Sequence, residues 1–230
     1  MLFRIAVMSI LAVAGMGAGW KDSAFPNWSE DVLLQLVTDS PWAKPKTVGF
    51  NWTKRAEQPL TYKDVPGADH NPAAPTGSPV GGIGGRKPKL VDRADIIIRW
   101  ASALPIRQAK ALYRQSDAGK VAAAVGGSQP DYVLEIFGVP AVVAHRGTGS
   151  VESVAMQSVY LRTASGHILK PGRVEATLQG LTLNILVYFP RKIPITLADR
   201  EVECAGDLQL FEFKEKFKLR SMVYREQLEL

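Results

Sequence analysis

Two stretches near the C-terminal end of the chain alternate between apolar and polar residues with a period of two. In residues 181–189, LTLNILVYF, every second residue is leucine, isoleucine, valine or phenylalanine, and in residues 211–219, FEFKEKFKL, phenylalanine and leucine alternate with charged residues. Successive side chains of a strand point to opposite faces of a sheet, so this pattern is typical of strands with one buried and one wet face. The lysines on the wet face would discourage edge-to-edge pairing.

Other segments extend this prediction to the whole chain. Ser29 can cap a helix with Glu30 and Asp31 in its first turn, and this helix should stop at Asp39-Ser40-Pro41. Residues 103–115 have the apolar spacing of a second helix. We expect further strands over 46–52, 94–102, 153–163 and 172–179, and two short strands within 131–145, broken at Gly138 and Pro140. The predicted fold class is α+β leaning β, mainly antiparallel sheet in the C-terminal half, with a short N-terminal helix and one further helix.

The first 19 residues have the layout of a secretory signal peptide. Arg4 precedes an apolar run over residues 5–14, and small residues follow, with Gly19 and Trp20 on either side of the expected cleavage point. The run is shorter than the roughly 20 apolar residues of a spanning helix, so we expect no stable membrane span once the leader is removed. An uncleaved membrane anchor is the alternative.

The remainder divides into three parts by composition. Residues 20–55 form a tryptophan-rich segment with the expected helix and strand, and residues 56–92 are rich in proline and glycine. Such a stretch has too little apolar surface to offset the entropy of ordering, which is typical of a linker or long loop. Residues 93–230 are predicted to form a β-rich globular domain.

The net charge of +6 and the pI near 9.4 allow contact with nucleic acid, anionic lipid or acidic polymers. The lysines and arginines are spread along the chain, and no run of five like charges occurs. We therefore do not expect nucleic acid as a partner, since that reading requires the lysines to form one continuous stripe.

Several residue types that carry chemistry were considered, and none forms a recognisable motif. The three histidines, His70, His145 and His167, match no metal-binding spacing. Catalysis by His145 with Ser150 or Ser153 and Asp131 would lack the GxSxG elbow. The acid pair Glu201 and Glu203 could serve a glycosidase, but paired surface charges are commoner. Cys204, the single cysteine, has no neighbouring histidine and is expected to be a small apolar residue in a strand.

The tryptophans have two interpretations. Exposed tryptophans can stack on sugar rings, and an exported protein would meet glycans. A tryptophan also buries a large area, and we expect Trp28, Trp42 and Trp100 to be structural anchors that hold the N-terminal segment on the sheet.

Several segments together resemble a known group. They are WSEDVLLQLVTDSPWAK at 28–44, the Gly/Pro-rich spacer, IRWASALPIRQA at 98–109, FPRKIPITLADREVEC at 189–204 and FKEKFKLRSMVYREQLEL at 213–230. This pattern resembles uncharacterised bacterial exported proteins, some of which are labelled GWxTD domain-containing proteins. The resemblance implies export and no established activity, and no catalytic residue is carried over from it.

These observations favour a non-enzymatic exported module, periplasmic or secreted, that binds an envelope or secreted protein. The alternative is an exported protein that binds or cleaves glycans. We assign no catalytic, cofactor-binding or metal-binding residue from the sequence. An exposed cleft lined by tryptophan and two carboxyl groups would favour the glycan reading, whereas an unpaired apolar sheet edge would favour binding by strand addition.

Overall fold

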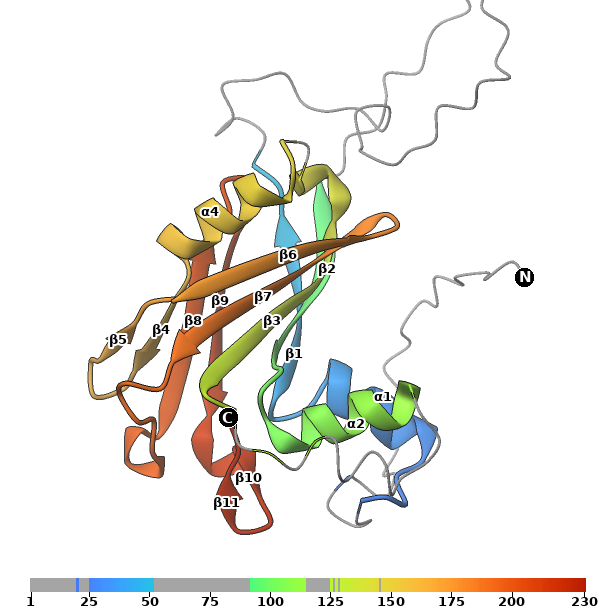
Figure 1. Ribbon diagram of the computed structural model, residues 1–230, viewed down its shortest axis with the longest axis vertical. Coiled ribbons are helices and arrows are strands. Elements are labelled where there is room, and N and C mark those ends of the chain that lie inside the picture. Colours follow the sequence, from blue (N-terminus) through green and yellow to red (C-terminus); the bar gives the residue numbers. More distant parts are fainter. Residues whose placement is uncertain are drawn as a thin grey trace, which may run out of the picture.

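The computed structural model describes residues 20, 25–51, 92–114, 125, 127, 129–144 and 146–230. The expected signal peptide, residues 56–91 of the expected linker, Trp52, His70 and His145 lie outside these residues. The described residues form three α-helices and eleven strands, so the chain is an α+β protein with more strand than helix, as predicted (Figure 1).

Two antiparallel sheets make up most of the molecule. The five-stranded sheet has the order β1-β2-β3-β7-β6, and the four-stranded sheet has the order β5-β4-β8-β9. The strands of the first are β1 (Ala43–Gly49), β2 (Arg93–Trp100), β3 (Asp131–Pro140), β7 (Thr182–Pro190) and β6 (Arg173–Gln179). Those of the second are β5 (Ile168–Leu169), β4 (Tyr160–Thr163), β8 (Glu201–Asp207) and β9 (Glu212–Lys218). A short hairpin, β10 (Val223–Tyr224) and β11 (Gln227–Leu228), follows near the C-terminal end.

The two alternating stretches are strands that bury one face, which confirms the prediction. In β7 the inward side chains from Leu183 to Phe189 are fully buried, and Phe213 and Phe217 of β9 are buried opposite exposed lysines. The ring of Trp100 on β2 meets the ring of Phe217 on β9, with centroids 5.8 Å apart. The core therefore lies between the two sheets. Leu181, expected on the buried face, lies instead in the turn before β7 and is exposed.

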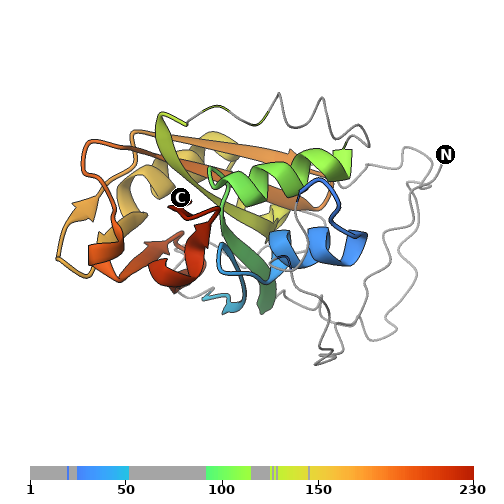
Figure 2. The ribbon, with the colours of Figure 1, turned by 90° about the horizontal axis from the view of Figure 1, so that it is seen from below.

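The N-terminal segment is part of this same fold. Helix α1 (Glu30–Thr38) begins after Ser29, whose hydroxyl accepts a hydrogen bond from the backbone N–H of Val32, as its sequence predicts. Strand β1 then pairs with β2 along its whole length. Helix α2 (Leu104–Arg114) lies beside α1 (Figure 2), and both lie against one end of the five-stranded sheet.

Two segments differ from their predicted structure. Residues 131–140 form one strand, β3, with an irregularity between Ile136 and Val139 where Gly138 has a φ of 82°. This strand is followed by a 3-10 helix, η3 (Ala141–Ala144), so the two short strands predicted here were wrong. The bulge lets the strand continue past Gly138 instead of ending there.

The strand expected over residues 153–163 begins only at Tyr160. Residues 148–158 form helix α4 (Thr148–Ser158), which packs on β6 and β8 and buries Val151 and Ala155 (Figure 1). The prediction of a single helix after α1 therefore missed one. A stretch this short has no clear period, and here packing against two sheets decides its structure.

Candidate functional site

The four-stranded sheet has an outer face that is rich in charged side chains, and we call it the charged face. The strand register places its residues in rows across β4, β8 and β9. One row is Tyr160, Ala205 and Lys214, and the next is Arg162, Glu203 and Lys216. The rows at the two ends add Glu201 with Lys218, and Asp207 with Glu212.

Ion pairs fix the centre of the charged face. The carboxylate of Glu203 accepts hydrogen bonds from the guanidinium of Arg162 and from the ammonium of Lys214, the latter at 2.8 Å. The hydrogen bond from Lys214 and that from Arg162 together outweigh the effect of desolvation and lower the pKa of Glu203. Glu201 pairs with Lys216 at 2.6 Å. The two acids are thus members of a fixed pattern of ion pairs.

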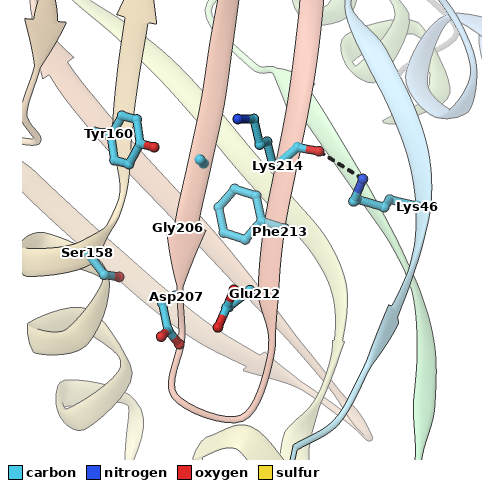
Figure 3. Close-up of a pocket in the computed structure, with 9 residues that line it drawn as sticks. Lys46, Ser158, Tyr160, Gly206, Asp207, Glu212, Phe213 and Lys214 are labelled. Carbon is cyan, nitrogen blue, oxygen red and sulfur yellow. Dashed lines mark hydrogen bonds between the residues drawn. The ribbon is translucent and has the colours of Figure 1, made fainter.

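A hollow of about 480 Å³ opens at one end of this face, and we call it the tyrosine hollow. It forms because the middle strand carries only Ala205 and Gly206 here, between the ring of Tyr160 on β4 and the side chain of Lys214 on β9 (Figure 3). The exposed side chains of Asp207 and Glu212 complete the rim with polar groups, as Figure 3 shows, and Ser158 also lines the hollow. An aromatic ring beside several polar groups can bind an organic ligand or a side chain of a partner.

Lys46 joins the tyrosine hollow from the other sheet. Strand β1 and strand β9 are edge strands of their sheets, and they lie side by side. The ammonium of Lys46 donates to the carbonyl oxygen of Lys214 at 2.8 Å (Figure 3). It also lies 3.3 Å from the carboxylate of Glu215. This side chain holds the two edges together and satisfies a carbonyl that has no strand partner.

A second hollow, of about 620 Å³, lies at the opposite end of the charged face. It is lined by Ala164, Arg200, Glu201, Lys218 and Arg220, and we call it the basic hollow. Again a small residue, Ala164, leaves the space, and charged side chains surround it.

The three predicted anchor tryptophans are all buried. Trp42 lies against Trp20, with ring centroids 4.8 Å apart, and its indole N–H donates to the carbonyl of Glu229 at 2.8 Å. Trp28 packs beside Tyr224, and Trp100 lies in the core between the sheets. These three rings are therefore not placed to stack on a sugar, whereas Tyr160, which the sequence did not single out, lines a hollow.

Strand β8 carries the acid pair and the single cysteine that the sequence brought forward as candidates. Glu201 and Glu203 lie on one face of β8, as expected, but the carboxylate of each is engaged in an ion pair with neighbouring cations, so they are not arranged as the free acid and base of a glycosidase. The thiol of Cys204 is buried in β8, and this burial raises its pKa, which agrees with the structural role expected of it.

The serines of the hypothetical His145 triad are not brought to Asp131. Ser150 and Ser153 lie on α4, whereas Asp131 begins β3, at the far end of that strand from α4. His167 has a different neighbourhood: the hydroxyl of Ser165 lies 3.2 Å from its Nδ1 and donates to Asp199 at 2.6 Å. A catalytic triad needs the histidine between the serine and the acid, so this arrangement does not activate the serine.

Two broader findings concern the described residues as a group. No cluster of three or more His, Cys, Asp or Glu side chains among them could hold a metal ion. No helix among them is long and apolar enough to cross a membrane.

Comparison with known proteins found no match to any protein-family model, to any curated protein or to any solved structure. The resemblance to exported GWxTD-labelled proteins therefore stays a prediction. The structure establishes an architecture of two antiparallel sheets with α1, α2 and α4. The charged face is the part of this architecture with the features of a functional surface.

Proposed function

We propose that the chain is an exported, non-enzymatic module, periplasmic or secreted, that binds an envelope or secreted protein through the charged face. Export rests on the pattern of residues 1–19, where a basic residue precedes a short apolar run and small residues. The observation that carries the binding proposal is the set of cross-strand charges that the sheet holds in place around Tyr160.

The charged face has the features of a protein-binding surface. Its acids and bases are fixed by mutual ion pairs, so little side-chain entropy is left to lose when a partner binds. Its charges alternate in sign, which gives specificity and speeds association with a partner of complementary pattern. Tyr160 stands beside an open hollow, and Arg162 and Lys170 lie 5.8 and 5.4 Å from the centre of its ring. Tyrosine and arginine are enriched among residues that dominate binding energy.

This proposal can be tested by copurification. The tagged full chain is crosslinked in intact cells that produce it, purified, and examined by mass spectrometry together with two variants. Lys214→Glu reverses a charge at the centre of the charged face, and Lys192→Glu makes the same change at an exposed position outside it. We expect one stoichiometric partner with the natural chain and with Lys192→Glu, and its loss with Lys214→Glu. If the partner is recovered equally with both variants, the charged face is not its binding site.

A second candidate function is supported by the tyrosine hollow alone. Tyr160 could stack on a sugar ring while Asp207 and Glu212 bind its hydroxyl groups, so a glycan ligand fits the same lining. A glycan array probed with the natural chain and with Tyr160→Ala separates the two readings. A specific signal that Tyr160→Ala abolishes would favour glycan binding, and no signal would leave the protein partner as the better account.

A further inference from the structure

The basic hollow concentrates positive charge from three separate elements. Arg200 directly follows the 3-10 helix η4 (Leu197–Asp199), Lys218 ends β9, and Arg220 belongs to the 3-10 helix η5 (Leu219–Met222). All three are exposed, and all three line the same hollow.

The acids near this hollow are already engaged elsewhere. Glu201 is the cross-strand neighbour of Lys218, but its carboxylate is held by Lys216 at 2.6 Å. The carboxylate of Asp199 is held within the turn that contains it. There it accepts hydrogen bonds from the hydroxyl of Ser165 and from the backbone N–H of Thr196. These hydrogen bonds, of which the one from Ser165 has the largest effect, lower the pKa of Asp199 and keep its carboxylate ionised within this turn.

Consequently the charge of the hollow is not neutralised by the protein. Within the part of the chain that the structure describes, Arg200, Lys218 and Arg220 form no ion pair with a carboxylate. Three cations around one open space repel one another, and an anion in that space would relieve the repulsion.

The backbone that carries Arg200 is fixed in an unusual conformation. Its φ is 60° and its ψ is −52°, a region that favours glycine. Two backbone hydrogen bonds hold it there, from Arg200 N–H to the carbonyl of Leu197 at 3.2 Å and from Leu219 N–H to the carbonyl of Arg200 at 2.9 Å. The backbone at Arg200 is therefore well determined, although this conformation costs the fold free energy.

We propose that the basic hollow binds a phosphate group. Two planar guanidinium groups and one ammonium suit a group with several oxygens and a double negative charge better than a single carboxylate. The hollow of about 620 Å³ is far larger than the roughly 30 Å³ that one water molecule takes up, so it has room for the rest of a molecule that carries the phosphate. That molecule is a free phosphorylated solute or a phospholipid. The proposal is independent of protein binding at the tyrosine hollow.

The first experiment measures binding of pyrophosphate to the full chain by isothermal titration calorimetry at low ionic strength. The test variant is Arg200→Gln/Arg220→Gln, and the control is Arg93→Gln/Lys192→Gln, which removes the same charge at exposed positions that do not line the hollow. We expect the natural chain and the control to bind alike. The test variant should bind at least about tenfold more weakly, because two charge-assisted contacts are lost.

A second variant distinguishes a loss of binding from a loss of folding. Arg200→Gly removes the guanidinium at a position whose backbone conformation suits glycine, so it should keep or raise the melting temperature while weakening pyrophosphate binding.

Cosedimentation with phosphatidylcholine vesicles, with and without phosphatidylglycerol, identifies the source of the phosphate. Retention on the phosphatidylglycerol vesicles that the test variant loses and the control keeps points to a lipid, and pyrophosphate binding without such retention points to a free solute. The proposal is overturned if the natural chain binds neither probe, or if the control loses binding as much as the test variant.

Discussion

At the scale of single residues, one buried charge cluster ties four elements together. Glu135 on β3 is almost fully buried, and its carboxylate accepts hydrogen bonds from Arg99 on β2 at 2.6 Å and from Lys110 on α2 at 2.8 Å. Arg99 also donates to the carbonyl of Val37 on α1. Burial alone would raise the pKa of Glu135, but the hydrogen bonds and charges of Arg99 and Lys110 outweigh it and lower the pKa to about 2.

This cluster predicts a defined pH dependence of stability. A carboxylate whose pKa is lower in the folded than in the unfolded protein stabilises the fold above its unfolded pKa, and this contribution disappears as the pH falls toward the folded pKa. For Glu135 the contribution should be complete above pH 4.5 and be lost as the pH approaches about 2. Glu135→Gln should lower the free energy of unfolding by about 3 kcal/mol at neutral pH, because it leaves Arg99 buried without its counter-charge.

Urea unfolding of the natural chain and of Glu135→Gln across this pH range checks the prediction. The difference between them should shrink as the pH falls from 4.5 toward 2. Glu201→Gln is the matched control, since its pair with Lys216 is largely exposed, is screened by solvent and should contribute little to stability. A difference that does not change with pH would contradict the assignment.

Trp42 is the residue at which the packing role of the stretch TDSPWAK, residues 38–44, can be tested. Its side chain is fully buried between Trp20, Tyr224 and the carbonyl of Glu229. Trp42→Ala should cost about 3–5 kcal/mol of unfolding free energy, the range typical of deleting a buried aromatic ring. Leu34→Ala, at a position of α1 that is 54% exposed, should change it by less than about 0.5 kcal/mol. Equal stability of the two variants would show that Trp42 is not an anchor.

At the scale of elements, helix α4 shows how tertiary contacts decide a local structure. It lies over the edge strand β6, where the carboxylate of Glu152 accepts a hydrogen bond from the backbone N–H of Ala176 at 2.8 Å. The residue after the helix, Val159, packs against Gly206 of β8. An alanine side chain at Gly206 would place its Cβ 2.8 Å from a methyl group of Val159 and 2.9 Å from the ring of Phe213.

Gly206→Ala should therefore destabilise the protein by about 1–3 kcal/mol, as overpacking does. Gly149→Ala, in the first turn of α4, meets no atom within 4 Å and should stabilise the protein by roughly 0.5 kcal/mol, because alanine loses less backbone entropy than glycine. Thermal unfolding followed by circular dichroism distinguishes the two. The same sign for both variants would be inconsistent with this packing.

The elements differ in how well the sequence alone predicts them. Strand β7 alternates strictly and β9 alternates except at Glu215, because each has one face toward the core, and α1 carries its own cap and stop signals. Helix α4 has no side-chain cap at Gly147, and only two of its residues are buried. Its local signals are weak, so its structure could not be predicted without its contacts to β6 and β8.

At the scale of the whole molecule, the N-terminal segment and the rest of the chain share one sheet and one core. Strand β1 pairs with β2, and Trp28, Trp42 and Val48 belong to the core cluster. If a protease site is introduced between residues 52 and 91 and cut, the two fragments should elute together in size-exclusion chromatography and separate only in denaturant. An N-terminal fragment that leaves the remainder under native conditions would contradict this.

The candidate site is also a property of the whole molecule. Tyr160, Ala205 and Lys214 form one row only because β4, β8 and β9 pair in a particular register, and Lys46 reaches the same hollow from the other sheet. No local pattern links these positions, so the sequence could suggest a sheet with a charged face but could not predict the hollows. Trp28, Trp42 and Trp100, which the sequence made conspicuous, are in the core instead.

The most direct test of the proposed function is site-specific photo-crosslinking in cells that produce the protein. A photoreactive phenylalanine analogue replaces Tyr160 at the tyrosine hollow or, as a control, Tyr113, which is 68% exposed on α2. We expect one adduct of defined mass from position 160 that Lys214→Glu abolishes, and no such adduct from position 113. No adduct from position 160, or the same products from both positions, would contradict binding of a partner protein at the charged face.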